Sequence, residues 1–125
     1  MQSEDNAPKL EVVSDDGDFV QLRLAETELR PDMIPENDPL IALLGERGYA
    51  RAALLSLAGT EYVNSCGLAL LLIWHKRFRD AGGKLVLHSI SSPMMETLQI
   101  LRMELVLHLA GDLPSAMEAL RGETA

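Results

Sequence analysis

The sequence predicts a single α/β domain, with a mainly parallel mixed sheet, an N-terminal hairpin and helices packed on the sheet. Three apolar runs have the length of strands, at 51–57, 85–88 and 105–109. They alternate with longer segments that favour helix. Strands that are apolar throughout are typical of parallel sheets covered by helices. A chain of 125 residues has the length of one domain. We expect the domain at 9–121, a disordered leader at 1–8 and a tail at 122–125.

The first two strands are expected at 9–13 and 19–24. The spacer between them is rich in Asp, Ser and Gly, which favour turns, so the two strands are predicted to form a hairpin. In the second strand, three apolar residues alternate with polar ones, which predicts one buried face: Val20, Leu22 and Leu24.

The segment 25–39 is expected to be an irregular surface excursion. It contains Pro31, Pro35 and Pro39, and proline fixes φ and removes a hydrogen-bond donor. A helix is predicted to begin at Pro39, with Asp38 as its N-cap.

Three further helices are predicted from their start and stop residues. The central helix is expected at 65–81, because Gly82-Gly83 follows as a stop signal. The next helix is expected to have Ser92 as its N-cap and Pro93 at its first position. Asp112 is expected to open a short terminal helix.

The composition argues against several classes of partner. The chain has 19 acidic and 11 basic residues and a formal net charge of −8. Nucleic acid or an anionic membrane surface would require a basic face, so neither is expected to bind. The basic island at 75–79 is interpreted as a solvated helix end rather than as a phosphate site. Since no apolar stretch reaches the ~18 residues of a membrane span, no membrane insertion is expected.

A cytoplasmic protein without a cofactor or metal is expected. The polar, acidic N-terminus is unlike a secretory signal, and the lone cysteine, Cys66, can form no internal disulfide. The three histidines have no cysteine or carboxylate neighbours at the spacing of metal ligands: His75, His88 and His108.

Three small polar residues stand where the strand at 51–57 gives way to the central helix: Asn64, Ser65 and Cys66. The first N–H groups of a helix have no internal partner, and the helix dipole adds partial positive charge there. The position suits a functional hydroxyl or thiol, although Asn or Ser there is also an ordinary N-cap. Cys66 is expected to be a small buried residue or, alternatively, a thiol activated by the dipole.

The central helix carries seven consecutive apolar residues, from Leu68 to Trp74. Helical spacing places one group of residues on the side that can pack on the sheet: Leu68, Leu71, Leu72 and His75. The opposite side holds Leu70, Ile73 and Trp74. Either another element covers these three residues, or they form an exposed docking surface beside Ser65.

Residues 54–68 read Leu-Leu-Ser-Leu-Ala-Gly-Thr-Glu-Tyr-Val-Asn-Ser-Cys-Gly-Leu. This stretch closely resembles the STAS domain family, the anti-sigma-factor antagonists, whose pattern is Asp-Leu-Ser-Gly, four residues, then Asp-Ser-Ser-Gly-Leu. The resemblance continues through Phe-Arg-Asp-Ala-Gly-Gly-Lys-Leu at 78–85 and covers 51–120. The chain departs from the pattern at four positions, where the family has two aspartates, a second serine and a glycine: Asn64, Ser56, Cys66 and Arg102.

The resemblance implies a regulator that works by binding rather than by catalysis. In such antagonists a partner serine kinase, which is also the anti-sigma factor, phosphorylates a serine that corresponds to Ser65. A metal-dependent serine phosphatase removes the phosphate. The partner-binding residues are then expected around Ser65: Asn64, Cys66, Gly67, Leu70, Ile73 and Trp74. The alternatives are a STAS adaptor that is never phosphorylated, as a subunit of a larger complex or transporter, and a thiol-dependent activity at Cys66.

Overall fold

The computed structural model describes residues 9–15, 19–25, 28–29, 39–45, 48–63 and 65–122. At 28–29, 39, 41–42, 62–63, 65–66 and 121–122 it describes the backbone alone. The expected leader at 1–8, the tail residues 123–125, Asn64 and most of the segment 25–39 lie outside the described residues.

The centre of the fold is a five-stranded sheet in the order β1-β2-β4-β6-β7. Its strands are β1 (Leu10–Asp15), β2 (Phe19–Leu24), β4 (Ala52–Ser56), β6 (Lys84–His88) and β7 (His108–Ala110). The hairpin β1–β2 is antiparallel, and β2, β4, β6 and β7 run parallel to one another. The structure confirms the predicted mixed sheet and its N-terminal hairpin.

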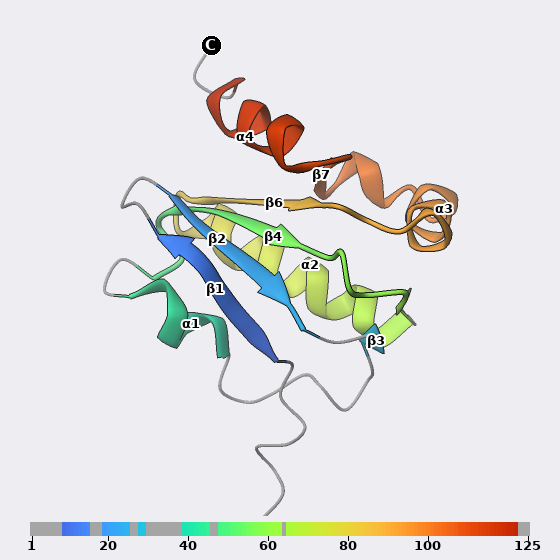
Figure 1. Cartoon of the computed structure of the whole chain (residues 1–125), viewed down its shortest axis with the longest axis horizontal. Coiled ribbons are helices and arrows are strands. Elements are labelled where there is room, and N and C mark those ends of the chain that lie inside the picture. The colour runs from blue at the N-terminus through green and yellow to red at the C-terminus, as the bar shows by residue number, and fades with distance from the viewer. Residues whose placement is uncertain are drawn as a thin grey trace, which may run out of the picture.

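Helices cover both faces of this sheet (Figure 1). On one face lie α1 (Pro39–Leu44) and α2 (Ser65–Asp80), and on the other lies α4 (Leu113–Gly122). The helix α3 (Ser92–Ile100) joins β6 to the short 3-10 helix at Met103–Leu105. No helix within the described ranges has the length and apolar character needed to cross a bilayer.

The alternation of side chains along the strands divides the core into two parts. Leu55 and Leu87 point to the side of α2, whereas Leu54 and Val86 point to α4, and all four are at most 2% exposed. The predicted buried face of β2 is confirmed, since Val20, Leu22 and Leu24 are each 1% exposed or less. The α2 side holds the larger cluster of buried residues.

Glycines at the end of α2 allow the chain to turn back into the sheet. Gly82 has φ +88°, a left-handed conformation that glycine adopts without strain. A Cβ at Gly83 would overlap the backbone oxygens of Tyr49 and Arg51. The predicted stop at Gly82-Gly83 is therefore confirmed, and the second glycine is needed for a close approach of two backbones.

Two predicted boundaries need correction. The last strand was expected at 105–109 but begins at His108, because Arg102 turns the chain with φ +59° into the 3-10 helix. The N-cap of α3 is Ser91 rather than Ser92, and its hydroxyl oxygen accepts from the Met94 N–H at 3.4 Å. The terminal helix begins as predicted, with an Asp112 carboxylate oxygen 2.9 Å from the Ser115 backbone nitrogen.

A second, two-stranded sheet was not predicted. The strand β3 (Glu28–Leu29) pairs in parallel with β5 (Tyr62–Val63), immediately before α2. Part of the segment 25–39, which was expected to be irregular, therefore forms a strand that pairs with the residues leading into α2.

Candidate functional site

The candidate site lies at the carboxyl edge of the sheet, where β4, β6 and β7 end. Parallel α/β sheets place their sites at this edge, because the chain leaves every strand there to form loops and helix starts. The ends of β4 and β6 are tied together by the Leu57 N–H, which donates to the His88 carbonyl at 2.9 Å. From β4 the chain passes through β5 and begins α2 at Ser65.

A tight turn carries the chain from β4 toward α2. The Ser56 hydroxyl oxygen accepts from the Ala58 N–H at 3.3 Å, and the Thr60 N–H donates to the Leu57 carbonyl at 3.0 Å. Thr60 is fully buried, whereas Ala58 and Gly59 are exposed. Ser56 stands where the resemblance has an aspartate, and its hydroxyl oxygen supplies the acceptor that closes this turn.

The structure places Ser65 at the first residue of α2, as the sequence predicts. The side chains of Ser65 and Cys66 and the whole of Asn64 lie outside the described residues. Gly67 is buried in the first turn of the helix. Three positions of the motif that carries the resemblance thus fall at this helix start, and Ser56 is the last residue of β4.

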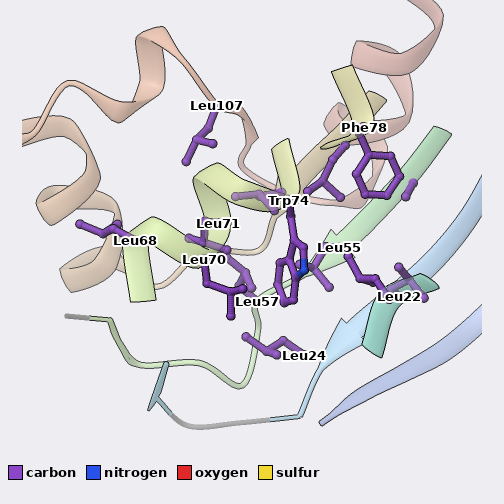
Figure 2. Close-up of a cluster of buried hydrophobic side chains, with 14 of the residues drawn as sticks. Leu22, Leu24, Leu55, Leu57, Leu68, Leu70, Leu71, Trp74, Phe78 and Leu107 are labelled. Carbon is purple, nitrogen blue, oxygen red and sulfur yellow. The ribbon is translucent and has the colours of Figure 1, made fainter. Parts of the chain in front are cut away.

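The proposed docking residues further along α2 require a correction. Leu70 is 2% exposed and Trp74 is fully buried, so neither can belong to an exposed surface. Figure 2 shows both side chains pointing into a cluster with Leu24, Leu55 and Leu57. The helix is covered on more than one side, because it contacts β6 of the main sheet and also the small sheet of β3 and β5. Ile73 is half-buried.

A polar cluster that the sequence reasoning missed lies at the same edge. His88 is 6% exposed, and its Nδ1 lies 2.8 Å from the Ser89 hydroxyl oxygen. Burial lowers the pKa of His88, although the negative charge of Asp112 acts in the opposite direction. The pKa of Asp112 is lowered by hydrogen bonds from Ser115 and then by His88. Because one Asp112 oxygen caps α4, this cluster places the end of β6 beside the start of α4.

Among the described residues, four exposed apolar side chains gather at the end of α3 and in the turn that follows it, rather than on α2. They are Ile100 at 78%, Leu101 at 51%, Leu105 at 74% and Val106 at 47% exposure. The predicted strand at 105–109 would have buried the last two. The apolar run alone gave no sign that the chain would form an exposed turn of helix there.

The chain resembles known proteins in sequence pattern and in fold. A model of the STAS domain matches residues 16–116. No curated protein matches the chain. Among solved structures, an anti-sigma-factor antagonist (STAS) domain protein from Planctomyces limnophilus is 20% identical, with a TM-score of 0.69, and the alignment covers 93% of this chain and 98% of that one.

A Thermotoga maritima protein, described in its crystal structure as a proposed anti-sigma factor antagonist, is 20% identical with a TM-score of 0.61. That alignment covers 91% of this chain and 94% of the other. The NMR structure of the Thermotoga protein gives 21% identity, a TM-score of 0.64 and 86% coverage of each chain. These structures share the fold, and the family model spans most of the sequence. The chain belongs to the STAS domain family.

Proposed function

We propose that this protein is a regulator of the anti-sigma-factor antagonist kind, which binds a partner serine kinase that is also an anti-sigma factor. Reversible phosphorylation of Ser65 switches the binding, and a metal-dependent serine phosphatase restores the unmodified form. The observation that carries the proposal is the start of α2 at Ser65, directly after β5, within the matched STAS region. The solved structures of similar fold include proteins described as anti-sigma-factor antagonists.

The proposed contact area is named the switch surface: the turn 58–61, Asn64, the start of α2 at 65–67 and the first turn of α3. The β4 and β6 ends that lead into these segments are adjacent in the sheet. Ala58, Gly59, Glu61 and Ser92 are exposed. This surface replaces the docking face that included Leu70 and Trp74.

A phosphate at Ser65 could break the complex without unfolding the protein. It adds a charge of about −1.5 to −2, which the positive end of the α2 dipole tolerates in the free protein. In a closed interface the same charge would lose its water, and an unpaired buried charge costs several kcal/mol. Changing a complex from mostly bound to mostly free requires about 5.5 kcal/mol, so one phosphate can supply most of the change.

A second candidate is a STAS adaptor that is never phosphorylated. It is favoured by the replacement of two motif aspartates, by Asn64 and Ser56, and of the second serine, by Cys66. A kinase that recognises the carboxylates would not find them in this chain. The Ser56 hydroxyl closes the turn after β4, so the fold does not need an aspartate there.

The test is a pull-down from native-host lysate with four forms of the full chain: wild type, Ser65→Ala, Ser65→Asp and Ser92→Asp. Ser92 is an exposed serine at the start of another helix, so Ser92→Asp adds the same charge at a comparable position. Captured proteins, and phosphorylation of the peptide that contains Ser65, are read by mass spectrometry.

Partner switching predicts that wild type and Ser65→Ala capture a serine kinase and that Ser65→Asp does not. It also predicts phosphate on Ser65 in wild type. If Ser92→Asp loses the kinase as fully as Ser65→Asp, the partner responds to charge anywhere on the switch surface rather than at Ser65. If all forms capture the same proteins and Ser65 carries no phosphate, the proposal is wrong and the adaptor is favoured.

A further inference from the structure

A pocket of about 590 Å³ lies at the edge of the sheet opposite to the switch surface. Its walls come from the segments that lead into β4, β6 and β7, and from the end of α2. Pockets of 300–1,000 Å³ are the usual size for small-molecule sites. The STAS resemblance assigns no role to this end of the molecule.

Three cationic side chains line the pocket: Arg51, Arg79 and Lys84. Within the described chain, none of the lining residues is acidic. The protein as a whole has a net charge of −8 and so repels anions over most of its surface. A concave site that collects positive side chains in such a protein is therefore suited to a small anion.

Two of the three cations are held in position by interactions of their own. Arg51, which is 7% exposed, lies with Nη2 2.6 Å from an Asp15 carboxylate oxygen and also donates to the Leu44 carbonyl. Lys84 donates from Nζ to the Ala119 carbonyl at 2.9 Å, which holds the ammonium between β6 and α4. Asp15 offsets part of the Arg51 charge, so Lys84 and Arg79 are the groups expected to contribute most.

Arg79 is the most accessible of the three cations. Its side chain is 63% exposed and its Nε lies 3.6 Å from an Asp80 oxygen. Asp80 is also bound by Lys76, whose Nζ lies 2.9 Å from the other carboxylate oxygen. Asp80 is thus shared by two cations, and the long Arg79 side chain can turn toward a ligand in the pocket.

Two histidines form a further part of the wall. The rings of His75 and His108 lie 5.3 Å apart between centroids. Burial, followed by the charge of Arg79, lowers the pKa of His75, so its ring is neutral near pH 7. A neutral imidazole can donate one hydrogen bond to an anion.

Apolar side chains complete the lining, among them Leu85, Val106 and Leu120. Val106 is 47% exposed, so its apolar surface is accessible to a ligand. An inorganic ion would contact the cations but leave this part of the pocket unused. The lining therefore suits a molecule with a charged group at one end and a short apolar body.

We propose that this pocket binds a small organic anion, with a phosphate or carboxylate head near Lys84 and Arg79 and an aliphatic body near Val106 and Leu120. The proposal does not depend on the proposed function, because the two sites lie at opposite edges of the sheet and share no residue.

The test is a titration of the full chain, followed by NMR chemical shifts and by calorimetry at low and at physiological salt. The probes are n-butyl phosphate, pentanoate and, as a head group alone, inorganic phosphate. The first two distinguish a phosphate from a carboxylate head. The variants are Arg79→Gln and Lys84→Gln. The matched control is Arg23→Gln, which removes the same charge from a half-exposed residue at the carboxyl end of β2 that does not line the pocket.

We expect at least one of the two organic anions to saturate the pocket, to bind more tightly than inorganic phosphate and to shift the resonances of Gly83 and His108. Arg79→Gln and Lys84→Gln should each weaken binding about fivefold or more, as expected for charge-assisted hydrogen bonds. Arg23→Gln should weaken it less than about twofold. The proposal is overturned if neither organic anion saturates, or if Arg23→Gln weakens binding as much as the pocket variants.

Discussion

Two buried histidines make the folding free energy depend on pH. The pKa of His75 and that of His88 are both lowered below the ordinary value of 6.5, mainly by burial. The unfolded chain therefore binds protons more readily than the folded chain as the pH falls through about 6.5. Stability is fully present above this pH and is expected to decrease steadily toward pH 5.

Urea denaturation at pH 7.5, 6.5 and 5.5 measures this effect. The pKa values of Asp80 and Asp112 are also lowered, from 3.8, so these carboxyl groups change stability only at more acidic pH. The double variant His75→Gln/His88→Gln should show a much smaller loss of stability between pH 7.5 and 5.5. An equal loss in wild type and variant would mean that other groups cause the pH dependence.

Gly83→Ala is expected to destabilise the protein through a backbone contact. The added methyl group would overlap the backbone carbonyl oxygens of Tyr49 and Arg51. Movement of a flexible side chain cannot relieve this overlap, because the atoms belong to the backbone. Forcing extra atoms into such a space costs about 1–3 kcal/mol. The matched control is Gly59→Ala, since a Cβ at Gly59 would meet nothing within 4 Å. Chemical denaturation should show a change of less than about 0.5 kcal/mol for the control; equal effects would contradict the contact.

At the scale of elements, the middle of α2, with Leu70 and Trp74, belongs to the core rather than to a docking face. Trp74→Ala is expected to cost about 3–5 kcal/mol of folding free energy, because the indole is fully buried between the helix and the sheet. Ile100→Ala, at a residue that is 78% exposed, should change it by less than about 0.5 kcal/mol. Thermal or urea unfolding measures both. A small cost for Trp74→Ala would mean that this face of α2 is more open than the structure shows.

The end of α3 contains a residue in a left-handed conformation. Arg102 has φ +59°, which costs a residue with a Cβ about 1–2 kcal/mol. Arg102→Gly removes this strain but gives the unfolded chain more conformational freedom. The added freedom lowers the folding stability by about 0.4–1 kcal/mol. We expect a net stabilisation of about 0.5 kcal/mol. Arg102→Ala, which keeps the Cβ and removes the charge, is the control and should give no gain in urea denaturation.

The elements that the sequence predicted well are those with unambiguous local signals. The apolar runs of β4 and β6 are buried, and the stop at Gly82-Gly83 and the cap at Asp112 lie where they were expected. The run at 105–109 gave a wrong start for the last strand. An apolar run predicts burial only if the chain reaches the sheet at that point. Leu107 is 4% exposed, but Leu105 is 74% exposed.

The candidate sites differ in how far the sequence could predict them. Ser65 at the start of α2 was predictable, since a strand, a turn and a helix start are contiguous in the chain. The burial of Trp74 was not predictable, because helical spacing cannot say which neighbouring elements will cover each side of a helix that is apolar all round. The opposite pocket was not predictable either. Its residues come from distant segments, such as Arg51, Arg79 and His108, which only the parallel sheet brings together.

At the scale of the whole molecule, α2 connects the two edges of the sheet. Its first residue, Ser65, belongs to the proposed switch surface, and Arg79, near its end, lines the pocket. A helix rises about 1.5 Å per residue, so the two positions are roughly 20 Å apart along the axis. The Debye length at physiological salt is about 8 Å, so the charge at one end is largely screened at the other.

The two edges are therefore expected to act independently. A unit charge and a dianion about 20 Å apart interact by only about 0.4 kcal/mol in water before screening, which is less than a twofold change in affinity. Ser65→Asp should bind n-butyl phosphate or pentanoate within about twofold of wild type, whereas Arg79→Gln should not. Calorimetric titration of the three proteins at physiological salt measures the difference. A severalfold change in Ser65→Asp would be too large for direct electrostatics, and would require that a conformational change carried through α2 couples the switch surface to the pocket.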